Sequence, residues 1–291
     1  MSSEKQKQIK LDFISKSAKV KNLLNQEPDF KKSRVILSPK KFVIAPKKGK
    51  KTLIKKSNIM DVGKKEDLPP ALKATIEKKA FLIKYRKKGD FKAIIIQDKK
   101  NRINNLFSTI CKIVLRNTKV YIKHPAKVSG RIKDKNWTKN NLSVNKKSIL
   151  LKNSKIDIDS ITYVKTKQKN NEKFIAISYK KDKKIITTYF KFDDHRLKIF
   201  WKYIRKKYIK IVEEIRKLKL NKKEKKAIVG IYSGAKLSNL PNLLGLSPKK
   251  SKKVIKNLID KKILEKNGKK IQLTNKGRVA TEVHLEDVNI G

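Results

Sequence analysis

Residues 224–278 constrain the fold most, because they alternate short amphipathic pieces with strong helix-ending signals. Apolar residues at helical spacing between Ala227 and Tyr232 predict a first helix. A second, shorter helix is expected to carry Pro241 in its first turn, where the missing N–H has no partner to lose, and to end at Gly245. The inward residues of this second helix are predicted to be Leu237, Leu240, Leu243 and Leu244.

A third helix and a hairpin complete this stretch. Ser247 supplies an N-cap hydroxyl and Pro248 a favoured first helical residue, so the pair predicts a helix start. The buried stripe of this helix is expected to be Val254, Ile255, Leu258 and Ile259. Asn267 and Gly268 then suit the positive φ angles of a type I′ turn between two strands. Three helices followed by a two-stranded hairpin predict a winged helix-turn-helix domain.

The outward face of the third helix bears on whether this domain reads DNA. With the apolar stripe inward, Lys249, Lys253, Lys256 and Asp260 point outward. Arginine reads guanine, and asparagine or glutamine reads adenine, whereas lysine attracts phosphate without discriminating between bases. The lysine-rich face therefore argues against base reading. Two interpretations of this face stay open: a helix face that is simply solvated, and one that binds DNA.

The chain is strongly basic. Its 291 residues hold 79 Lys+Arg against 25 Asp+Glu, which gives a net charge of +54. Such a charge attracts any polyanion. Because the cations are spread from end to end, charge alone does not identify a nucleic-acid partner. The length allows two or three domains, and a hydrophobic content of 38% permits packed cores.

Cys111 is the single cysteine, so no disulfide can form within the chain, as in a reducing cytoplasm. No apolar run approaches the roughly 20 residues that span a bilayer. The N-terminus lacks the hydrophobic core of a signal peptide. The sequence therefore predicts a soluble cytoplasmic protein.

An internal repeat precedes the predicted winged helix. Residues 34–62 and 142–164 both read as strand, turn, strand, turn, strand, and Ile59 matches Ile161. Each copy continues into a hairpin of alternating apolar residues and ends in an amphipathic helix. Antiparallel strands closed by one helix, twice over, predict a pair of pleckstrin-homology-like (PH-like) modules.

The two terminal helices of the repeat differ in length. Asp98 precedes the first, and Asp193 and Asp194 precede the second, where acids suit the helix dipole. The apolar face of the first helix is predicted to comprise Ile103, Leu106, Phe107, Ile110, Cys111 and Val114. The second helix carries a heptad seam of Leu197, Trp201, Ile204, Tyr208, Ile211, Ile215 and Leu218. Such a seam predicts either self-association or a strut packed on the chain's own C-terminal domain.

The predicted fold class is α+β, with three domains. Residues 1–118 form the first PH-like module, residues 119–220 the second module with its long terminal helix, and residues 221–291 the winged helix-turn-helix domain. Outside the repeat, one strand is expected from Ile9 to Ile14, and residues 63–70 are expected to form a loop.

Motifs for chemistry are sparse. His124, His195 and His284 lie far apart, and none has a second ligand at the spacing of a zinc site. No phosphate-binding loop and no paired carboxylates for acid–base work stand out. We therefore predict no catalytic residue, no metal and no cofactor, and expect a protein that is not an enzyme.

The order of several short motifs resembles the archaeal taxis protein CheF family. These motifs are Tyr232-Ser233-Gly234, the stretch from Pro241 to Gly245, and the stretch from Leu273 to Arg278. In the middle of the chain, residues 120–137 resemble the family's VKHPA-like strand followed by a Gly, an Asp and a Trp. The resemblance covers roughly residues 30–285.

The resemblance implies an adaptor between the chemotaxis system and the archaellum. Its expected partners are the phosphorylated response regulator CheY, the archaellum switch proteins and, in addition, CheC and CheD, which places it in the cytoplasm at the base of the motor. The seam adds a homodimer to these expectations. Candidate partner contacts are Tyr232, Leu240, Pro241, Lys249, Lys253 and Lys256. The alternative function is a winged-helix DNA-binding transcription regulator.

Overall fold

The computed structural model describes residues 11–20, 28–39, 41–76, 78–182, 184–192, 195–268 and 270–288. The chain divides into two compact units. The first unit takes in residues 1–120, 140–154 and 192–203, and the second takes in residues 121–139, 155–191 and 204–291. The acids predicted to precede the second terminal helix, Asp193 and Asp194, lie outside the described residues.

A seven-stranded antiparallel sheet dominates the first unit. Its strands are β1 (Leu11–Val20), β2 (Lys31–Leu37), β3 (Lys41–Pro46), β4 (Thr52–Lys55), β5 (Ile59–Lys64), β6 (Lys79–Lys87) and β7 (Asp90–Asp98). The strand order is β4-β3-β2-β1-β7-β6-β5, with a short helix η1 (Lys56–Asn58) between β4 and β5. The strand predicted from Ile9 to Ile14 lies on β1 for its described part.

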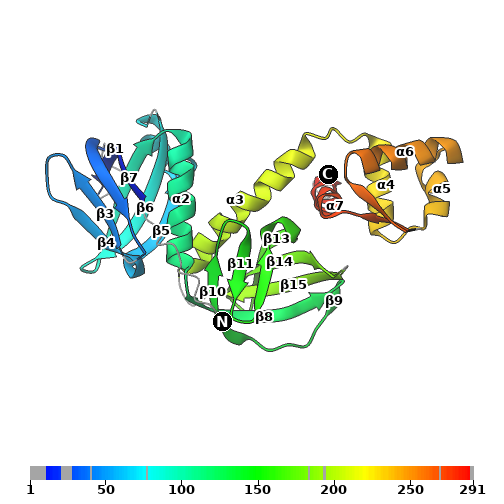
Figure 1. The fold of residues 1–291 in the computed structure, drawn as a ribbon, viewed down its shortest axis with the longest axis horizontal. Coiled ribbons are helices and arrows are strands. Elements are labelled where there is room, and N and C mark those ends of the chain that lie inside the picture. The colour runs from blue at the N-terminus through cyan, green and yellow to red at the C-terminus, as the bar shows by residue number, and fades with distance from the viewer. Residues whose placement is uncertain are drawn as a thin grey trace. The chain divides into compact units, whose positions relative to one another are not determined.

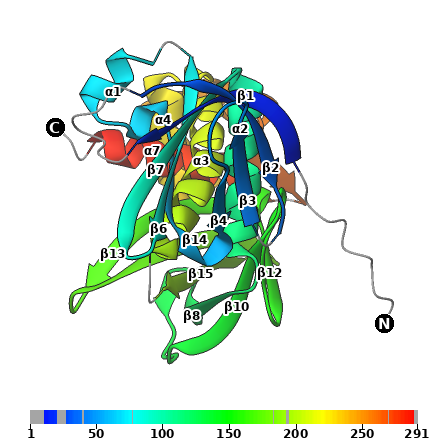
Figure 2. The same ribbon diagram turned by 90° about the vertical axis from the view of Figure 1, so that its left-hand side faces the viewer.

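Helix α2 (Lys100–Leu115) packs on one face of this sheet (Figure 1, Figure 2). Its Phe107 ring meets Phe81 of β6 edge-on, with 6.2 Å between ring centroids. All six residues predicted for its apolar face are buried, including Cys111. The amphipathic pattern therefore predicted both the helix and its inward face.

The opposite face of the first sheet is covered by residues between β5 and β6. This segment holds η2 (Lys65–Asp67) and α1 (Pro70–Ala74), so residues 63–70 are not the single loop that the sequence suggested. Leu68, Leu72 and Ile76 bury their side chains here because they have the apolar face of the sheet to cover.

The second sheet repeats the first, strand by strand. Its strands are β8 (Thr118–Val128), β9 (Arg131–Ile132), β10 (Thr138–Val144), β11 (Ser148–Leu151), β12 (Ser154–Asp157), β13 (Ile161–Lys169), β14 (Glu172–Lys181) and β15 (Lys184–Lys191), with η3 (Ile158–Ser160) before β13. Its order, β12-β11-β10-β8-β15-β14-β13, has the same topology as the first sheet, apart from the added β9. Both edge pairs contain a bulge at the same place, between Ile59 and Asp61 and between Ile161 and Tyr163. The predicted repeat is confirmed, and neither sheet closes into a barrel.

Helix α3 (Arg196–Arg216) ends two residues before the last residue of the predicted seam, Leu218. Ile215 is buried in the hydrophobic core of the C-terminal domain, and Tyr208, Ile211 and Leu218 pack against that core. The Tyr208 hydroxyl also donates to the carbonyl of Thr162, at 3.2 Å. These contacts favour the strut over the self-association seam, which stays a prediction.

The C-terminal domain has the predicted order of three helices and a hairpin. Its elements are α4 (Lys222–Tyr232), η4 (Leu237–Asn239), α5 (Leu240–Leu244), α6 (Pro248–Asp260), β16 (Leu264–Asn267), β17 (Lys270–Leu273) and α7 (Asn275–Val288). Gly245 ends α5 in the left-handed conformation, and Ser247 caps α6, as the sequence predicted. Two details differ: Leu237 is 39% exposed, and Asn267 lies inside β16, so that the turn begins at Gly268.

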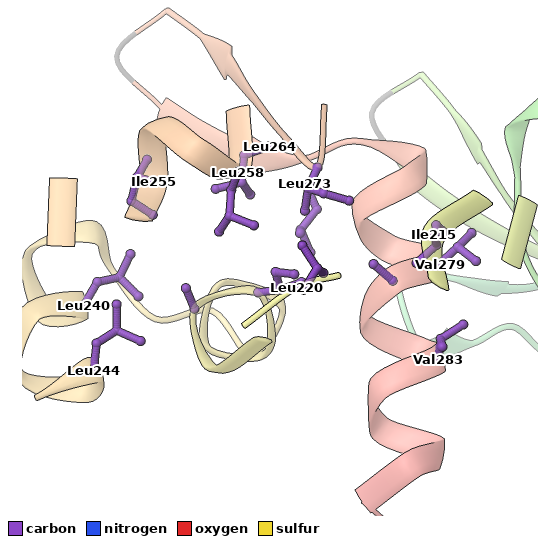
Figure 3. Close-up of a cluster of buried hydrophobic side chains, with 14 residues drawn as sticks. Ile215, Leu220, Leu240, Leu244, Ile255, Leu258, Leu264, Leu273, Val279 and Val283 are labelled. Carbon is purple, nitrogen blue, oxygen red and sulfur yellow. The ribbon is translucent and has the colours of Figure 1, made fainter. Parts of the chain in front are cut away.

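The core of this domain gathers one or more apolar side chains from each of its α-helices and strands (Figure 3). Leu258 of α6, Leu264 of β16 and Leu273 of β17 meet Val279 and Val283 of α7 there. Helix α7 was not predicted, and it supplies one wall of the core. Its first turn is set by Thr274, whose hydroxyl accepts a hydrogen bond from the N–H of Gly277.

Candidate functional site

The outer face of α6 is rich in lysine. Ser251, Ile255 and Leu258 are buried on the inner side of the helix. Lys249, Lys253 and Lys256, three of the predicted partner contacts, are exposed on the outer side. An amphipathic helix that buries its apolar stripe exposes its polar face to solvent, so the fold alone turns these ammonium groups outward.

A shallow depression of about 440 Å³ lies beside this face. Leu246 and Val254, which also pack against the domain core, give it an apolar floor. Lys222 and Lys223 come from the first turn of α4, and Lys250 and Lys253 come from α6. No carboxylate is among its described lining residues, so the depression is suited to an acidic group.

The start of α4 builds one wall of the depression, although the sequence predicted only a domain boundary at residue 221 and a helix from Ala227. Asn221 and Glu224 form a reciprocal capping box: the Glu224 N–H donates to the Asn221 side chain at 2.8 Å, and the Asn221 N–H donates to the Glu224 carboxylate at 2.9 Å. An acidic residue three positions after an N-cap residue was the available signal for this helix start.

Glu224 also forms an ion pair in the core. It is 1% exposed, and its carboxylate oxygens lie 2.7 and 2.8 Å from the Lys261 Nζ just beyond the end of α6. Both oxygens therefore have partners, and the carboxylate joins α4 to α6. The role of Glu224 is structural: it fixes the first turn of α4, which carries Lys222 and Lys223.

The remaining predicted contacts lie on other parts of the domain. Tyr232 is 42% exposed, and its hydroxyl donates to the Glu282 carboxylate of α7 at 3.0 Å. Burial, and then the charge of Glu282, raises the pKa of Tyr232. Pro241 is half-buried. Leu240 is 1% exposed and packs in the core, so its side chain is unavailable to a partner.

The predicted seam residues fall into two groups. Ile204 and Ile215 are buried, whereas the half-buried group is Leu197, Trp201, Tyr208, Ile211 and Leu218. Since Tyr208, Ile211 and Leu218 already pack on the C-terminal core, a second chain would have to share them.

The histidines stand in separate environments. The Nδ1 of His124 lies 2.8 Å from the Thr188 hydroxyl. Burial, followed by the charge of Lys181, lowers the pKa of His124, so the ring is neutral at pH 7. Across the described ranges, no group of three or more His, Cys, Asp or Glu side chains comes together as a metal site would require.

The described helices include none that is long and apolar enough to cross a membrane.

Two repeated antiparallel sheets and a helical domain with a lysine-rich face define a mixed α/β protein whose candidate site is an open surface. The model of Archaeal Chemotaxis signal transduction system protein F matches residues 11–210, and the chain belongs to this family. A second model, Domain of unknown function (DUF8579), matches residues 219–285 of the C-terminal domain.

Two relatives from Halobacterium salinarum extend the match over most of the chain. Taxis protein CheF2 is 25% identical over 267 residues, which cover 89% of this chain and 92% of the relative. Taxis protein CheF1 is 21% identical over 275 residues, which cover 90% of this chain and 91% of the relative. Family membership and these relatives support a role in archaeal chemotaxis.

Proposed function

We propose that the protein is a chemotaxis adaptor that binds the phosphorylated response regulator CheY and links it to the archaellum switch complex. The supporting observation is the lysine-lined depression beside α6, with no carboxylate among its described lining residues, in a chain of this family. Response regulators carry an acidic pocket and acidic faces, which such a surface complements. Complementary charge mostly raises the rate of encounter and selects the partner.

In this proposal the two repeats are PH-like modules that bind the motor's switch proteins, and the C-terminal domain is a winged helix used for protein contacts. The complex would then sit in the cytoplasm at the base of the motor. CheY carries the signal only if its two states bind differently, because an equal affinity cannot shift any equilibrium.

The test is a calorimetric titration of the full chain with purified CheY, with and without beryllofluoride as phosphoryl mimic. We expect tighter binding to the activated form. The variant Lys253→Glu places a carboxylate in the depression and should weaken that binding about tenfold. Its matched control is Lys252→Glu, an equal charge change on an exposed neighbour that does not line the depression. Equal affinity for both CheY states would refute the proposal.

The alternative is a DNA-binding regulator, favoured by the order of three helices and a hairpin. The exposed side of α6 carries lysines and Asp260, which favour phosphate contact without base reading. A regulator requires a DNA site bound at physiological salt about a thousandfold or more tighter than random DNA. Such a site would replace the adaptor proposal.

A further inference from the structure

The two repeats differ at equivalent positions of one sheet face. The bulge that both share fixes the equivalence: Tyr85 of β6 pairs with Ile59, and Tyr179 of β14 pairs with Ile161. Counting back along β6 and β14 from these tyrosines, Ala80 corresponds to Phe174.

The neighbouring strands extend this comparison. Leu82 corresponds to Ala176, and their partners across the ladder are Ile95 in the first repeat and Tyr189 in the second. An aliphatic sheet face in the first repeat is therefore aromatic in the second.

In the first repeat this face is sealed. Leu68, Leu72 and Ile76, from the segment that joins β5 to β6, pack over Ala80 and its neighbours. Each of these three side chains is at most 3% exposed. The segment of residues 65–76, the plug, thus covers the sheet face.

The second repeat has no such segment. β13 and β14 are joined by Asn170 and Asn171 alone, with φ angles of 48° and 58°, as in a tight type I′ hairpin. Where the first repeat has its plug, the second has an open hollow of about 560 Å³, a volume typical of binding pockets.

The floor of the hollow is a cluster of three aromatic rings. Trp137, from the connection between β9 and β10, meets Phe174 at 5.9 Å between ring centroids. Phe174 in turn lies 4.9 Å from Tyr189. At the rim, Ile132 of β9 is 78% exposed. Phe174 is only 8% exposed, whereas Trp137 and Tyr189 are half-buried. The apolar surface open to a ligand is therefore that of Ile132, Trp137 and Tyr189.

Lysines surround these rings. The Nζ atoms of Lys123 and Lys191 lie 5.5 and 5.3 Å from the centroid of Trp137. Lys167 and Lys169 of β13 line the hollow as well. The one carboxylate among the described lining residues is Glu172, which the Lys191 Nζ approaches to 2.9 Å. That pair shows how an acidic side chain is held at this rim.

The ring positions also bear on the class of ligand. Because two ammonium groups lie against Trp137, a stacked nucleic-acid base would have to displace them from a favourable cation–π position. Carboxylates on a protein segment would instead pair with these lysines without displacing them from Trp137. Charge and shape together therefore favour an acidic protein segment that carries apolar side chains.

We propose that this aromatic–lysine pocket, formed by Trp137, Phe174, Tyr189, Lys123, Lys167 and Lys169, binds an acidic segment of a partner protein. The segment packs apolar side chains against the half-buried Trp137 and Tyr189, as Leu72 packs on the equivalent face in the first repeat. The inference is independent of the proposed function of α6, because the two surfaces share no residue.

The probe is a fluorescein-labelled synthetic peptide that keeps the apolar spacing of Leu68, Leu72 and Ile76 and has glutamate at most other positions. Its binding to the full chain is followed by fluorescence anisotropy at physiological salt. Two control peptides replace either the glutamates by glutamine or the apolar residues by serine. We expect each control peptide to bind about tenfold more weakly than the probe.

Matched protein variants locate the site. Lys167→Glu with Lys169→Glu reverses two charges of β13 in the pocket. Lys165→Glu with Lys173→Glu reverses two exposed charges of β13 and β14 that do not line it. We expect about a tenfold loss for the first pair and less than about threefold for the second. Trp137→Ala should cost about thirtyfold. The lysine pairs lie at exposed positions, so the test holds even where the tryptophan variant loses stability.

Equal losses for the two lysine pairs would overturn the proposal, since binding would then follow net charge alone. Undiminished binding of the serine peptide would overturn it as well. The same two pairs are tested with a single-stranded DNA oligomer and with vesicles of anionic lipid. A larger pocket-specific loss for either of these than for the peptide would assign the pocket to nucleic acid or membrane instead.

Discussion

Replacing Lys261 should open the C-terminal domain, because Glu224 would remain as a buried charge without its cation. Glu224 is 1% exposed and lies within 2.8 Å of the Lys261 Nζ through both oxygens. Breaking a buried ion pair by removing one partner costs about 3–5 kcal/mol. The Lys261 side chain is 30% exposed, so water screens part of the interaction, and we expect about 2 kcal/mol for Lys261→Met.

Removing both charges should cost much less. In Glu224→Gln with Lys261→Met, the amide oxygen still accepts the hydrogen bond from the Asn221 N–H, and no charge is left buried. Apolar replacement of a whole buried pair is often neutral. We therefore expect the double variant to lose less than about 1 kcal/mol, so that the second substitution rescues the first.

Hydrogen–deuterium exchange of the α4 and α6 amides is the suitable assay, because it reports local opening in a chain with several domains. A loss of about 2 kcal/mol corresponds to roughly thirtyfold faster exchange. The control is Lys252→Met, which removes an exposed α6 lysine. If Lys261→Met exchanges no faster than this control, or if the double variant is worse than the single one, the reasoning is refuted.

Three further predictions concern the same domain. In Gly277→Ala the added Cβ would lie 2.2 Å from the carbonyl oxygen of Ile263, so α7 must shift. We expect the domain to lose about 1–3 kcal/mol of stability and the α7 amides to exchange faster. Unchanged exchange in α7 would contradict this. The hydrogen bond from Lys180 lowers the pKa of Glu265 from the usual 4.5. The pairing therefore stabilises the domain above pH 4.5, and this stabilisation is lost as the pH falls through the lowered pKa. An NMR titration of Lys180→Met should show the pKa of Glu265 rise. Tyr208→Glu should loosen α3 from the C-terminal core without changing the mass in solution, whereas a halved mass would establish the self-association seam.

Local signals predicted much of the C-terminal domain. Ser247 and Pro248 marked the start of α6, and Gly245 marked the end of α5. These signals act locally, because they meet the hydrogen-bonding and conformational needs of the backbone at a helix end whatever the tertiary surroundings. The α6 lysines followed from the position of its buried stripe. The depression beside them did not, because its second wall comes from α4, and only the tertiary packing places the two helices together.

Helix α7 shows what local pattern cannot supply. Its sequence contains Gly277 and β-branched residues, which weaken an isolated helix. It forms because Val279 and Val283 have a core to enter and because Thr274 caps its first turn. The end of α3 is a similar case: the heptad spacing continued to Leu218, but the chain leaves the helix after Arg216 so that Leu220 can reach the same core.

The shared strand order has an evolutionary consequence. When a sequence encodes the same sheet twice, a connection in either copy can become shorter or longer while the strand pairing of that copy is kept. Selection can then change one copy while the other keeps its structure. The difference between the two-residue connection at Asn170 and Asn171 and the longer one in the first repeat is of that kind. Descendants of the same duplication could thus acquire new affinities through loop length alone, with no new fold to invent.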